Sequence, residues 1–411
     1  MGTTRVLVIG AGAAGSAAAT VLAQAAAELE VEIVGAEDRL PYNRTTVNKG
    51  LLSGAVDAAG IAMPGMDLPG VTWRLGERVV HLDPMNRSVR LAGGEQLSAD
   101  AVVLAVGARP RRLPVEVPGG NRMLTLRSAD DTAQLRGQLT PGAPVLVVGA
   151  GLIGTETSGV LRQAGHAVVL VDAAATPMAP LVGPTVAEWI LREHRAAGVD
   201  VRAGTTVQSL RPRADKSLSV TLSDGTQLTS AVVLPALGVT PDTDWLAVSG
   251  VLGDALAGAV AVDGQQRVIG RPGLYAAGDA AAVPGPDGRP VRIEHWGAAL
   301  AQGRAAARAV LADLGMAEPE EHLPAVELPS YSTYVHDTKL TILGWPQLAT
   351  QEVPLLGTPG DDRFAVALHD QQQRLVGAVG VGGARAVNQI RDLLQRRAPV
   401  EELAPLQAVT R

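Results

Sequence analysis

Short apolar runs of strand length alternate with helix-forming segments along most of this chain. Residues 5–9 and 31–34 are two such runs, and a segment of small residues from 16 to about 28 lies between them. The order strand, helix, strand predicts one βαβ unit. A second unit of this pattern begins at residue 145, and a buried strand is expected over 101–106. The pattern therefore indicates an α/β fold.

The remaining segments predict shorter strands and two further helices. Hairpin strands are expected at 79–81 and 88–91, a strand at 258–262, and an alanine-rich helix from about 295 to 314. A region rich in proline and glutamate, 318–329, then marks a boundary. The last part of the chain predicts a small α+β domain. Its expected strands and helix are 339–343, 364–368, 375–381 and 386–396.

Each predicted βαβ unit carries glycines at the turn between its first strand and its helix. The spacing Gly-x-Gly-x-x-Gly is typical of turns that bind the pyrophosphate of a dinucleotide. The first glycine allows a tight turn, the second lets a phosphate approach the backbone, and the third lets the helix lie close to the strand. These glycines are Gly10, Gly12 and Gly15 in the first unit and Gly149, Gly151 and Gly154 in the second.

The two glycine motifs belong to a longer internal repeat. The segment from Gly94 to Gly107 follows the first motif, and it returns after the second motif as Gly225 to Gly238, again with an apolar strand before its last glycine. The offset between these two segments is nearly the same as the offset between the two glycine motifs. Such close agreement indicates two copies of one nucleotide-binding design. One copy alone would suggest a dehydrogenase, whereas two predict two different dinucleotides.

An acidic residue follows the second strand of each unit, where the ribose of a dinucleotide is normally bound. This residue is Glu37 in the first unit and Asp172 in the second. A 2′-phosphate would be repelled by Asp172, and residues 173–175 are alanines that offer no arginine for it. We therefore expect NADH rather than NADPH at the second unit.

The composition excludes several classes of protein. Of the 411 residues, 46% are hydrophobic and 18% charged, as in ordinary globular proteins, and the length suggests two or three domains. A net charge of −6 without basic clusters argues against a nucleic-acid-binding protein. Neither a transmembrane helix nor a signal peptide is visible, so we expect a cytoplasmic protein. We also expect a monomer or a homodimer.

Cysteine is absent, and this limits the redox chemistry more than any other count. Without thiols the chain can hold no catalytic disulfide and no cysteine-ligated iron–sulfur cluster, and no metal site is predicted. Lysine is rare, with Lys49, Lys216 and Lys339 among 35 lysine and arginine residues. A lysine at position 49, just after the first unit, is therefore informative.

Further motifs occur in a fixed order after the first glycines. The chain carries LPYNR followed by Lys49, Ala-x-Gly turns at Gly107 and Gly238, YAAGDAA around Asp279, and RIEHWGAALAQG from Arg292. Over essentially its whole length it resembles the two-dinucleotide flavoprotein reductases of the pyridine-nucleotide oxidoreductase superfamily. The FAD-containing ferredoxin and rubredoxin reductases that use NADH are the most similar group. The resemblance implies an α/β fold with two Rossmann-like dinucleotide-binding domains, as in glutathione reductase, and a small C-terminal α+β domain.

The resemblance also implies domain bounds and site residues. The FAD-binding domain would comprise 1–112 and 240–320, the NAD-binding domain 113–239, and a C-terminal interface domain 321–411. The residues implied for FAD are Gly10, Gly12, Ala14, Gly15, Glu37, Arg44, Lys49, Gly107, Asp279, Glu294 and Trp296. Those implied for NAD are Gly149, Gly151, Ile153, Gly154, Asp172 and Gly238. The catalytic residues implied are Lys49 near flavin N5, Glu156 at the nicotinamide end, and Trp296 beside the flavin.

Three positions depart from the family pattern. Thr45 and Thr46 stand where a proline pair is common. Ala36 stands where the acid after the second strand often lies, so Glu37 is expected to bind the ribose with altered geometry. Residues 332–335 replace a Trp-Ser-Asp-Gln run, whose tryptophan lies over the flavin near the partner's docking surface. The identity of the electron acceptor therefore stays open.

Three functions are compatible with these observations. The first, which we favour, is hydride transfer from NADH to FAD, followed by electron transfer to a ferredoxin-type iron–sulfur protein that serves an oxygenase. The second is the same chemistry on a small acceptor, such as a quinone, a nitro compound or a biosynthetic intermediate, and the lost tryptophan favours it. The third is a flavoprotein redox sensor that responds to NADH.

Overall fold

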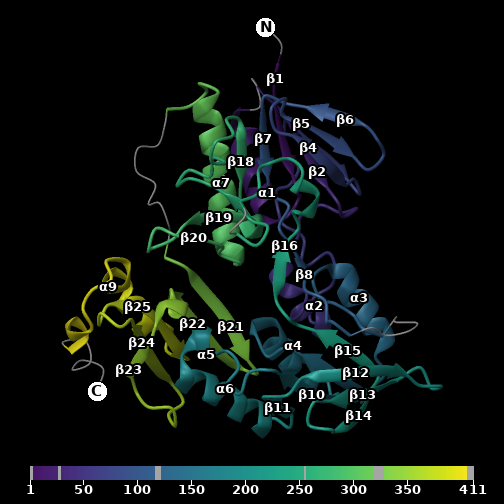
Figure 1. Ribbon diagram of the computed structural model, residues 1–411, viewed down its shortest axis with the longest axis vertical. Coiled ribbons are helices and arrows are strands. Elements are labelled where there is room, and N and C mark those ends of the chain that lie inside the picture. Colours follow the sequence, from purple (N-terminus) through teal and green to yellow (C-terminus); the bar gives the residue numbers. More distant parts are fainter. Residues whose placement is uncertain (1–2, 26–28, 116–121, 254–255, 319–327, 405–411) are drawn as a thin grey trace. The chain divides into compact units, whose positions relative to one another are not determined.

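The chain folds into two compact units in this computed structural model (Figure 1). The residues that the structure describes are 3–25, 29–115, 122–253, 256–318 and 328–404. The first unit comprises 1–45, 58–109 and 239–327, and the second comprises 46–57, 110–238 and 328–411. The division into three domains given above differs from this one, because it places residues 46–57 in the FAD-binding domain, and it stays a prediction.

The first unit is built on a five-stranded parallel sheet in the order β18-β7-β1-β2-β3. Its central strand is a continuous apolar run because both faces of the sheet are covered, and Val6, Leu7 and Val8 are fully buried. The strands are β1 (Thr4–Ile9), β2 (Leu29–Gly35), β3 (Val71–Leu75), β7 (Ala101–Leu104) and β18 (Leu274–Ala276).

Two helices of small residues, α1 (Ala13–Leu22) and α7 (Trp296–Asp313), pack against each other in the first unit. Their alanines share one core with the parallel strands. A Cβ added at Gly303 of α7 would lie 2.1 Å from the carbonyl oxygen of Ala14, so the two backbones are almost in contact. Shorter elements complete the unit. They are β4 (Val79–Asp83), β5 (Ser88–Leu91), β6 (Gln96–Ser98), β17 (Val260–Ala261), β19 (Ala281–Pro284) and β20 (Pro290–Val291), with the 3-10 turns η1 (Ala23–Ala25), η3 (Asp244–Leu246) and η4 (Gly278–Ala280).

The second unit contains a four-stranded parallel sheet in the order β11-β10-β9-β15. These strands are β9 (Pro144–Val148), β10 (Ala167–Asp172), β11 (Asp200–Ala203) and β15 (Val232–Pro235). Its helices are α2 (Gly50–Ser53), α3 (Ala129–Gln138), α4 (Leu152–Gln163), α5 (Ala179–Val182) and α6 (Pro184–Ala196). An antiparallel meander follows, with β12 (Val207–Pro212), β13 (Leu218–Leu222) and β14 (Gln227–Ser230). Where the chain crosses between units it forms η2 (Arg44–Thr46), and β8 (Ala108–Pro110) pairs with β16 (Val239–Pro241).

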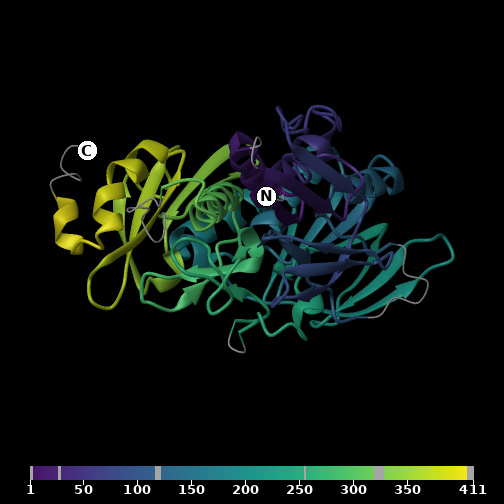
Figure 2. The ribbon, with the colours of Figure 1, turned by 90° about the horizontal axis from the view of Figure 1, so that it is seen from above.

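The second unit also contains the C-terminal antiparallel sheet, in the order β21-β22-β25-β24-β23. Helix α8 contacts β22 and β25, and Figure 2 shows the yellow helices beside these yellow-green strands. The elements are β21 (Ser330–Val335), β22 (Thr338–Gly344), η5 (Pro346–Leu348), β23 (Gln351–Leu356), β24 (Phe364–His369), β25 (Leu375–Val381), α8 (Ala384–Gln389), α9 (Arg391–Gln395) and η6 (Val400–Leu403).

The two parallel sheets repeat one connectivity, which confirms the internal repeat. In each copy a strand, a helix and a second strand are followed by a third parallel strand, an antiparallel meander and a fourth parallel strand. The copies run from β1 to β7 and from β9 to β15. The α/β fold class expected from the sequence is therefore confirmed.

The structure corrects two of the helices expected from the sequence. The helix expected from residue 16 begins at Ala13, directly after the N-cap Gly12, and gives way to a 3-10 turn after Leu22. Residues 26–28 of that expected helix lie outside the described residues. The helix expected over 386–396 is divided into α8 and α9 at Ile390, which is fully buried between them. The break lets side chains of both short helices enter one core.

Two histidines meet where the C-terminal sheet packs on α6. His194 of α6 has no exposed surface, and neither of its ring nitrogens has a hydrogen-bond partner among the described residues. The ring of His336, in the turn between β21 and β22, lies edge-on with its centre 4.8 Å away. Burial first, and then the charge of His336, lower the pKa of His194 to about 4. Glu193 and Asp337 carry negative charge near His336 but do not outweigh its burial, so its pKa is lowered too.

We expect the protein to lose stability as the pH falls from about 6.5 to about 4. The unfolded chain binds a proton at His194 in this range whereas the folded chain excludes it, so the stability is complete above the unfolded pKa. The loss from this residue is on the order of 3 kcal/mol. Urea unfolding across this range measures it. His194→Leu should flatten that part of the profile, and an unchanged slope in the variant would contradict the assignment.

Candidate functional site

The turns after β1 and β9 have the same backbone geometry. Gly10 and Gly149 lie in the left-handed region, with φ of +112° and +104°. A Cβ at Gly10 would lie 2.2 Å from the carbonyl oxygen of Ala105, and one at Gly149 would lie 2.5 Å from that of Ala236. Glycine is required at both positions because another residue would be strained and would clash with the neighbouring strand's end.

The last two glycines of each motif differ in the space around them. A Cβ at the third glycine, Gly15 or Gly154, would lie 1.8 Å from the carbonyl oxygen of the first. A Cβ at the middle glycine, Gly12 or Gly151, would meet nothing within 4 Å. The third glycine therefore lets the helix begin close to its strand, while the middle one leaves open space in front of the turn.

The open space lies at a helix N-terminus that suits an anion. Both α1 and α4 begin directly after the middle glycine, without a side-chain cap and without an acidic residue in the first turn. The first N–H groups of a helix have no partner within the helix, and the helix dipole favours negative charge there. Each turn therefore fits the pyrophosphate of a dinucleotide.

Asp172 ends β10 and holds its carboxylate against the second glycine turn. Its Oδ2 accepts a hydrogen bond of 2.7 Å from the backbone N–H of Ala150, which belongs to that turn. Its Oδ1 accepts another of 2.7 Å from the N–H of Ala174. The carboxylate is therefore fixed at the edge of the sheet, where the ribose of a dinucleotide bound to this turn would lie.

Glu37 is held by side chains. Its Oε2 accepts a hydrogen bond of 2.7 Å from the Tyr42 hydroxyl, and its Oε1 accepts one of 2.5 Å from the Arg44 guanidinium. The guanidinium also lies 5.0 Å from the centre of the Tyr42 ring. Burial by itself raises the pKa of Glu37, but the Arg44 charge and the two hydrogen bonds lower it overall. The structure thus places Glu37 and Arg44 in one cluster.

Glu156 of α4 is 7% exposed, and both of its oxygens have donors. Its Oε1 lies 2.9 Å from the ammonium of Lys49, and its Oε2 accepts a hydrogen bond of 3.0 Å from the Asn48 amide. The Thr333 hydroxyl and the Tyr334 backbone N–H donate to Oε1 at 2.5 and 3.3 Å. A buried carboxylate is costly unless such partners compensate it. The structure therefore brings together Lys49 and Glu156, which are far apart in the sequence.

The segment that carries Lys49 is anchored on α3. The Thr132 hydroxyl donates a hydrogen bond of 2.9 Å to the carbonyl of Val47, and Arg136 donates one of 3.2 Å to that of Leu51. Leu52 enters the core of the parallel sheet. The backbone on both sides of the lysine is therefore held in place.

Asp279 lies in η4, at the end of β18 in the first unit. The preceding residue, Gly278, donates its N–H to the side chain of the buried Gln302 at 2.8 Å. Burial lowers the pKa of the nearby His295, and the negative charge of Asp279 opposes this without reversing it. The loop that carries Asp279 is therefore tied to α7.

The remaining predicted residues of the first unit lie at the start of α7 and after β7. Trp296 is the first residue of α7, and Glu294 pairs with Arg292 at 2.8 Å. The carbonyl of Gly107 accepts a hydrogen bond of 3.1 Å from the N–H of Asp242. In the second unit the carbonyl of Gly238 accepts the equivalent bond, 3.0 Å long, from Arg111.

Two predicted residues directly precede the third glycine of each motif and differ in exposure. Ala14 is 5% exposed, because α7 packs on it, whereas Ile153 in the first turn of α4 is 45% exposed. Both stay predictions for their nucleotide sites.

Comparison with known proteins agrees with this geometry. Residues 4–303 match the family model described as pyridine nucleotide-disulphide oxidoreductase, which covers more than half of the chain. The chain belongs to this family. One relative is the ferredoxin–NAD(+) reductase component of the p-cumate 2,3-dioxygenase system of Pseudomonas putida. It is 34% identical over 295 residues, which are 71% of this chain and 71% of the relative.

Other relatives of this oxidoreductase match along nearly its whole length. The 5,5′-dehydrodivanillate O-demethylase ferredoxin reductase subunit of a Sphingobium species is 30% identical over 96% of this chain and 92% of its own. Among solved structures, the covalent putidaredoxin reductase–putidaredoxin complex contains a chain that superposes with a TM-score of 0.89. It is 26% identical and covers 100% of this chain and 99% of that chain.

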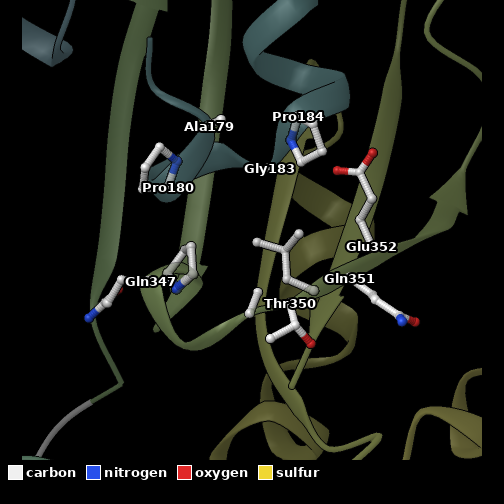
Figure 3. A pocket seen from close by; sticks show the side chains of 11 residues that line it. Ala179, Pro180, Gly183, Pro184, Gln347, Thr350, Gln351 and Glu352 are labelled. Carbon is white, nitrogen blue, oxygen red and sulfur yellow. The ribbon is translucent and has the colours of Figure 1, made fainter. Parts of the chain in front are cut away.

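A pocket in the second unit of this oxidoreductase has none of the predicted site residues in its lining. It has a volume of about 600 Å³ and lies between the start of α6 and the turn from η5 to β23. Figure 3 shows Glu352 at its edge, pointing toward Pro184. The Glu352 carboxylate accepts a hydrogen bond of 3.3 Å from the N–H of Thr185, so this acid caps the N-terminus of α6.

Sequence reasoning missed three residues of the site. Asn48, Thr333 and Gln302 each hold a predicted residue or its loop in place. Asn48 directly precedes Lys49, and Gln302 lies within the motif RIEHWGAALAQG. Both could therefore have been found from their neighbours in the sequence. Thr333 lies in the run 332–335, which departs from the family pattern, but nothing in the sequence connects it to Glu156. Within the described residues there is no group of three or more metal-ligating side chains and no helix long and apolar enough to cross a bilayer.

Proposed function

We propose that this chain is an FAD-dependent reductase that takes a hydride from NADH and passes electrons to a ferredoxin-type iron–sulfur protein that serves an oxygenase. The observation that carries the proposal is the repeated glycine turn, which forms two cradles for dinucleotides in one chain without cysteine. When bound, FAD accepts a hydride at N5 and can release electrons singly. The relatives named above are ferredoxin reductase components, which supports this choice of acceptor.

We assign FAD to the first cradle and NADH to the second. Glu37 and Arg44 would bind the nucleotide end of FAD, and Asp279 its ribityl chain. Asp172 would bind the ribose of NADH through its fixed carboxylate. The corresponding domains are 1–112 with 240–320 for FAD and 113–239 for NAD, and 321–411 would form the interface domain.

Lys49 and Glu156 would serve the reacting ends of the two nucleotides. Lys49 would supply positive charge near flavin N5, and Glu156 would orient the lysine and contact the nicotinamide end. A hydride transfer needs no dedicated general base, so the protein acts mainly by positioning its ligands and excluding water.

The two middle glycines allow a matched pair of variants. Both have extended backbone dihedrals that valine also adopts, and neither has a neighbour within 4 Å of an added Cβ. Gly12→Val should weaken FAD binding about a hundredfold because the side chain fills the phosphate space. Gly151→Val should leave the protein yellow but weaken NADH binding by a similar factor. Absorbance of the purified proteins and NADH titration measure both effects.

Each variant of this pair is the control for the other, since only one cradle is filled in each. If Gly12→Val kept its FAD, or if Gly151→Val lost it, the assignment of the two cradles would be wrong.

Asp172→Asn should reduce the preference for NADH over NADPH about tenfold, because it removes the charge that repels a 2′-phosphate. The amide oxygen can still accept the bond from Ala150 in the glycine turn, whereas the amide nitrogen cannot accept the bond from Ala174. The ratio of kcat/KM for the two nucleotides measures this. A wild-type enzyme that prefers NADPH would refute the choice of nucleotide.

The acceptor is tested by mixing the enzyme with NADH and a [2Fe–2S] ferredoxin without oxygen. We expect ferredoxin reduction at a rate that saturates with ferredoxin concentration, because a docked complex must form before electron transfer. Stopped-flow absorbance follows the reaction. Reduction of artificial acceptors without stimulation by any ferredoxin would count against this partner.

A second candidate is direct reduction of a small acceptor such as a quinone or a nitro compound. The observation that favours it is the run Ser332–Val335, which lacks the tryptophan that ferredoxin reductases carry there. Saturable turnover with such an acceptor, and none with ferredoxin, would select this candidate.

A further inference from the structure

The Glu156 carboxylate is fixed by donors from two other segments of the second unit. Glu156 itself stands in α4, Asn48 and Lys49 directly precede α2, and Thr333 and Tyr334 belong to β21. Four donors reach its two oxygens at distances between 2.5 and 3.3 Å. The orientation of the carboxylate group is therefore determined by the fold.

The two donors of β21 act on the same oxygen as the lysine. The Thr333 hydroxyl, the Tyr334 N–H and the Lys49 ammonium all approach Oε1, whereas Asn48 alone approaches Oε2. An oxygen held by Thr333 and Tyr334 cannot rotate away, so the direction from which Lys49 binds is set by β21. Hydrogen bonds to a charged group are stronger than neutral ones, which makes this arrangement stiff.

The position of Thr333 is in turn set by the C-terminal sheet. In β21 the side chains of Thr333 and Val335 are buried, and those of Ser332 and Tyr334 are exposed, as expected for alternating faces of a strand. Thr333 lies opposite Leu340 of β22, which is fully buried. The Thr333 hydroxyl lies on an otherwise apolar face of the sheet and donates its hydrogen bond to Glu156.

We propose that Thr333 is a positioning residue, which holds Glu156 so that the Lys49 ammonium keeps one fixed direction. The last sheet of the chain thereby takes part in the chemistry through one of its side chains. The inference rests on the proposed function, because it assigns Lys49 and Glu156 to hydride transfer between the two nucleotides.

The rarity of lysine provides a test that does not require turnover. In the purified protein, trace acetylation with acetic anhydride and mass spectrometry report the rate at Lys49, with the exposed Lys216 and Lys339 as internal standards. Thr333→Val should raise the Lys49 rate several-fold because the amine is less well held in its ion pair. Thr333→Ser keeps the hydroxyl and should behave as the wild type. Thr341→Val is a matched control, since Thr341 is also buried in this sheet.

Stopped-flow reduction of the bound flavin by NADH tests the consequence. Thr333→Val should lower the limiting rate constant about tenfold, as expected for one hydrogen bond to a charged group. The NADH concentration that gives half the limiting rate should change less than the limiting rate constant does, because the glycine turn and Asp172 are untouched. Thr333→Ser keeps the hydroxyl and should reduce the flavin at the wild-type rate. If Thr333 had only a structural role, Thr333→Val and Thr333→Ser would not differ in this way.

The outcomes separate this inference from the proposed function. If Thr333→Val leaves both the Lys49 acetylation and the reduction rate unchanged, Thr333 does not position the pair. If acetylation rises while reduction is unchanged, the pair is held by Thr333 but does not serve hydride transfer, and the inference is also overturned. If NADH fails to reduce even the wild-type protein, the proposed function fails, and the acetylation rates still decide whether Thr333 holds the ion pair.

Discussion

This structure depends on one constraint. The helix after each glycine turn must begin almost in contact with the strand that precedes it. The distance of 1.8 Å between a Cβ at Gly15 and the carbonyl oxygen of Gly10 leaves no room for any side chain. The same distance recurs at Gly154. Because the helix starts so close, its first N–H groups and its dipole face the end of the parallel sheet, which is where open α/β sheets bind nucleotides. The rest of each copy keeps this turn in place.

In the first unit, small residues allow the helix after the glycine turn to pack closely against a second helix. The alanines of α1 and α7 let the two helices approach until Gly303 almost touches the backbone of Ala14. Larger side chains would push α7 away, and with it the loop that carries Asp279, which is tied to α7 through Gln302. Close helix packing and the placement of a predicted cofactor residue therefore have one physical cause, since both depend on the distance between α1 and α7.

The acidic residue that follows the second strand is fixed by different partners in the two copies. Asp172 is fixed by backbone N–H groups next to its glycine turn, whereas Glu37 is fixed by Arg44 and Tyr42. The buried Glu156 has more partners than either, and it obtains them from two other segments of its unit. A carboxylate in such surroundings is stable only when its donors are complete, so its neighbours are constrained as strongly as the acid itself.

The amino-acid sequence by itself determined the local elements and their repetition. The glycine spacing, the apolar strands and the offset between the two copies predicted both parallel sheets and both cradles, because turns and strands depend on nearby residues. Only the tertiary structure decided which distant side chains meet. The contact of Thr333 with Glu156 joins a strand and a helix that are far apart in the sequence, and the break at Ile390 depends on a core assembled from several strands. Neither could be read from nearby residues, because the energy that decides them comes from packing and from the pairing of buried charge.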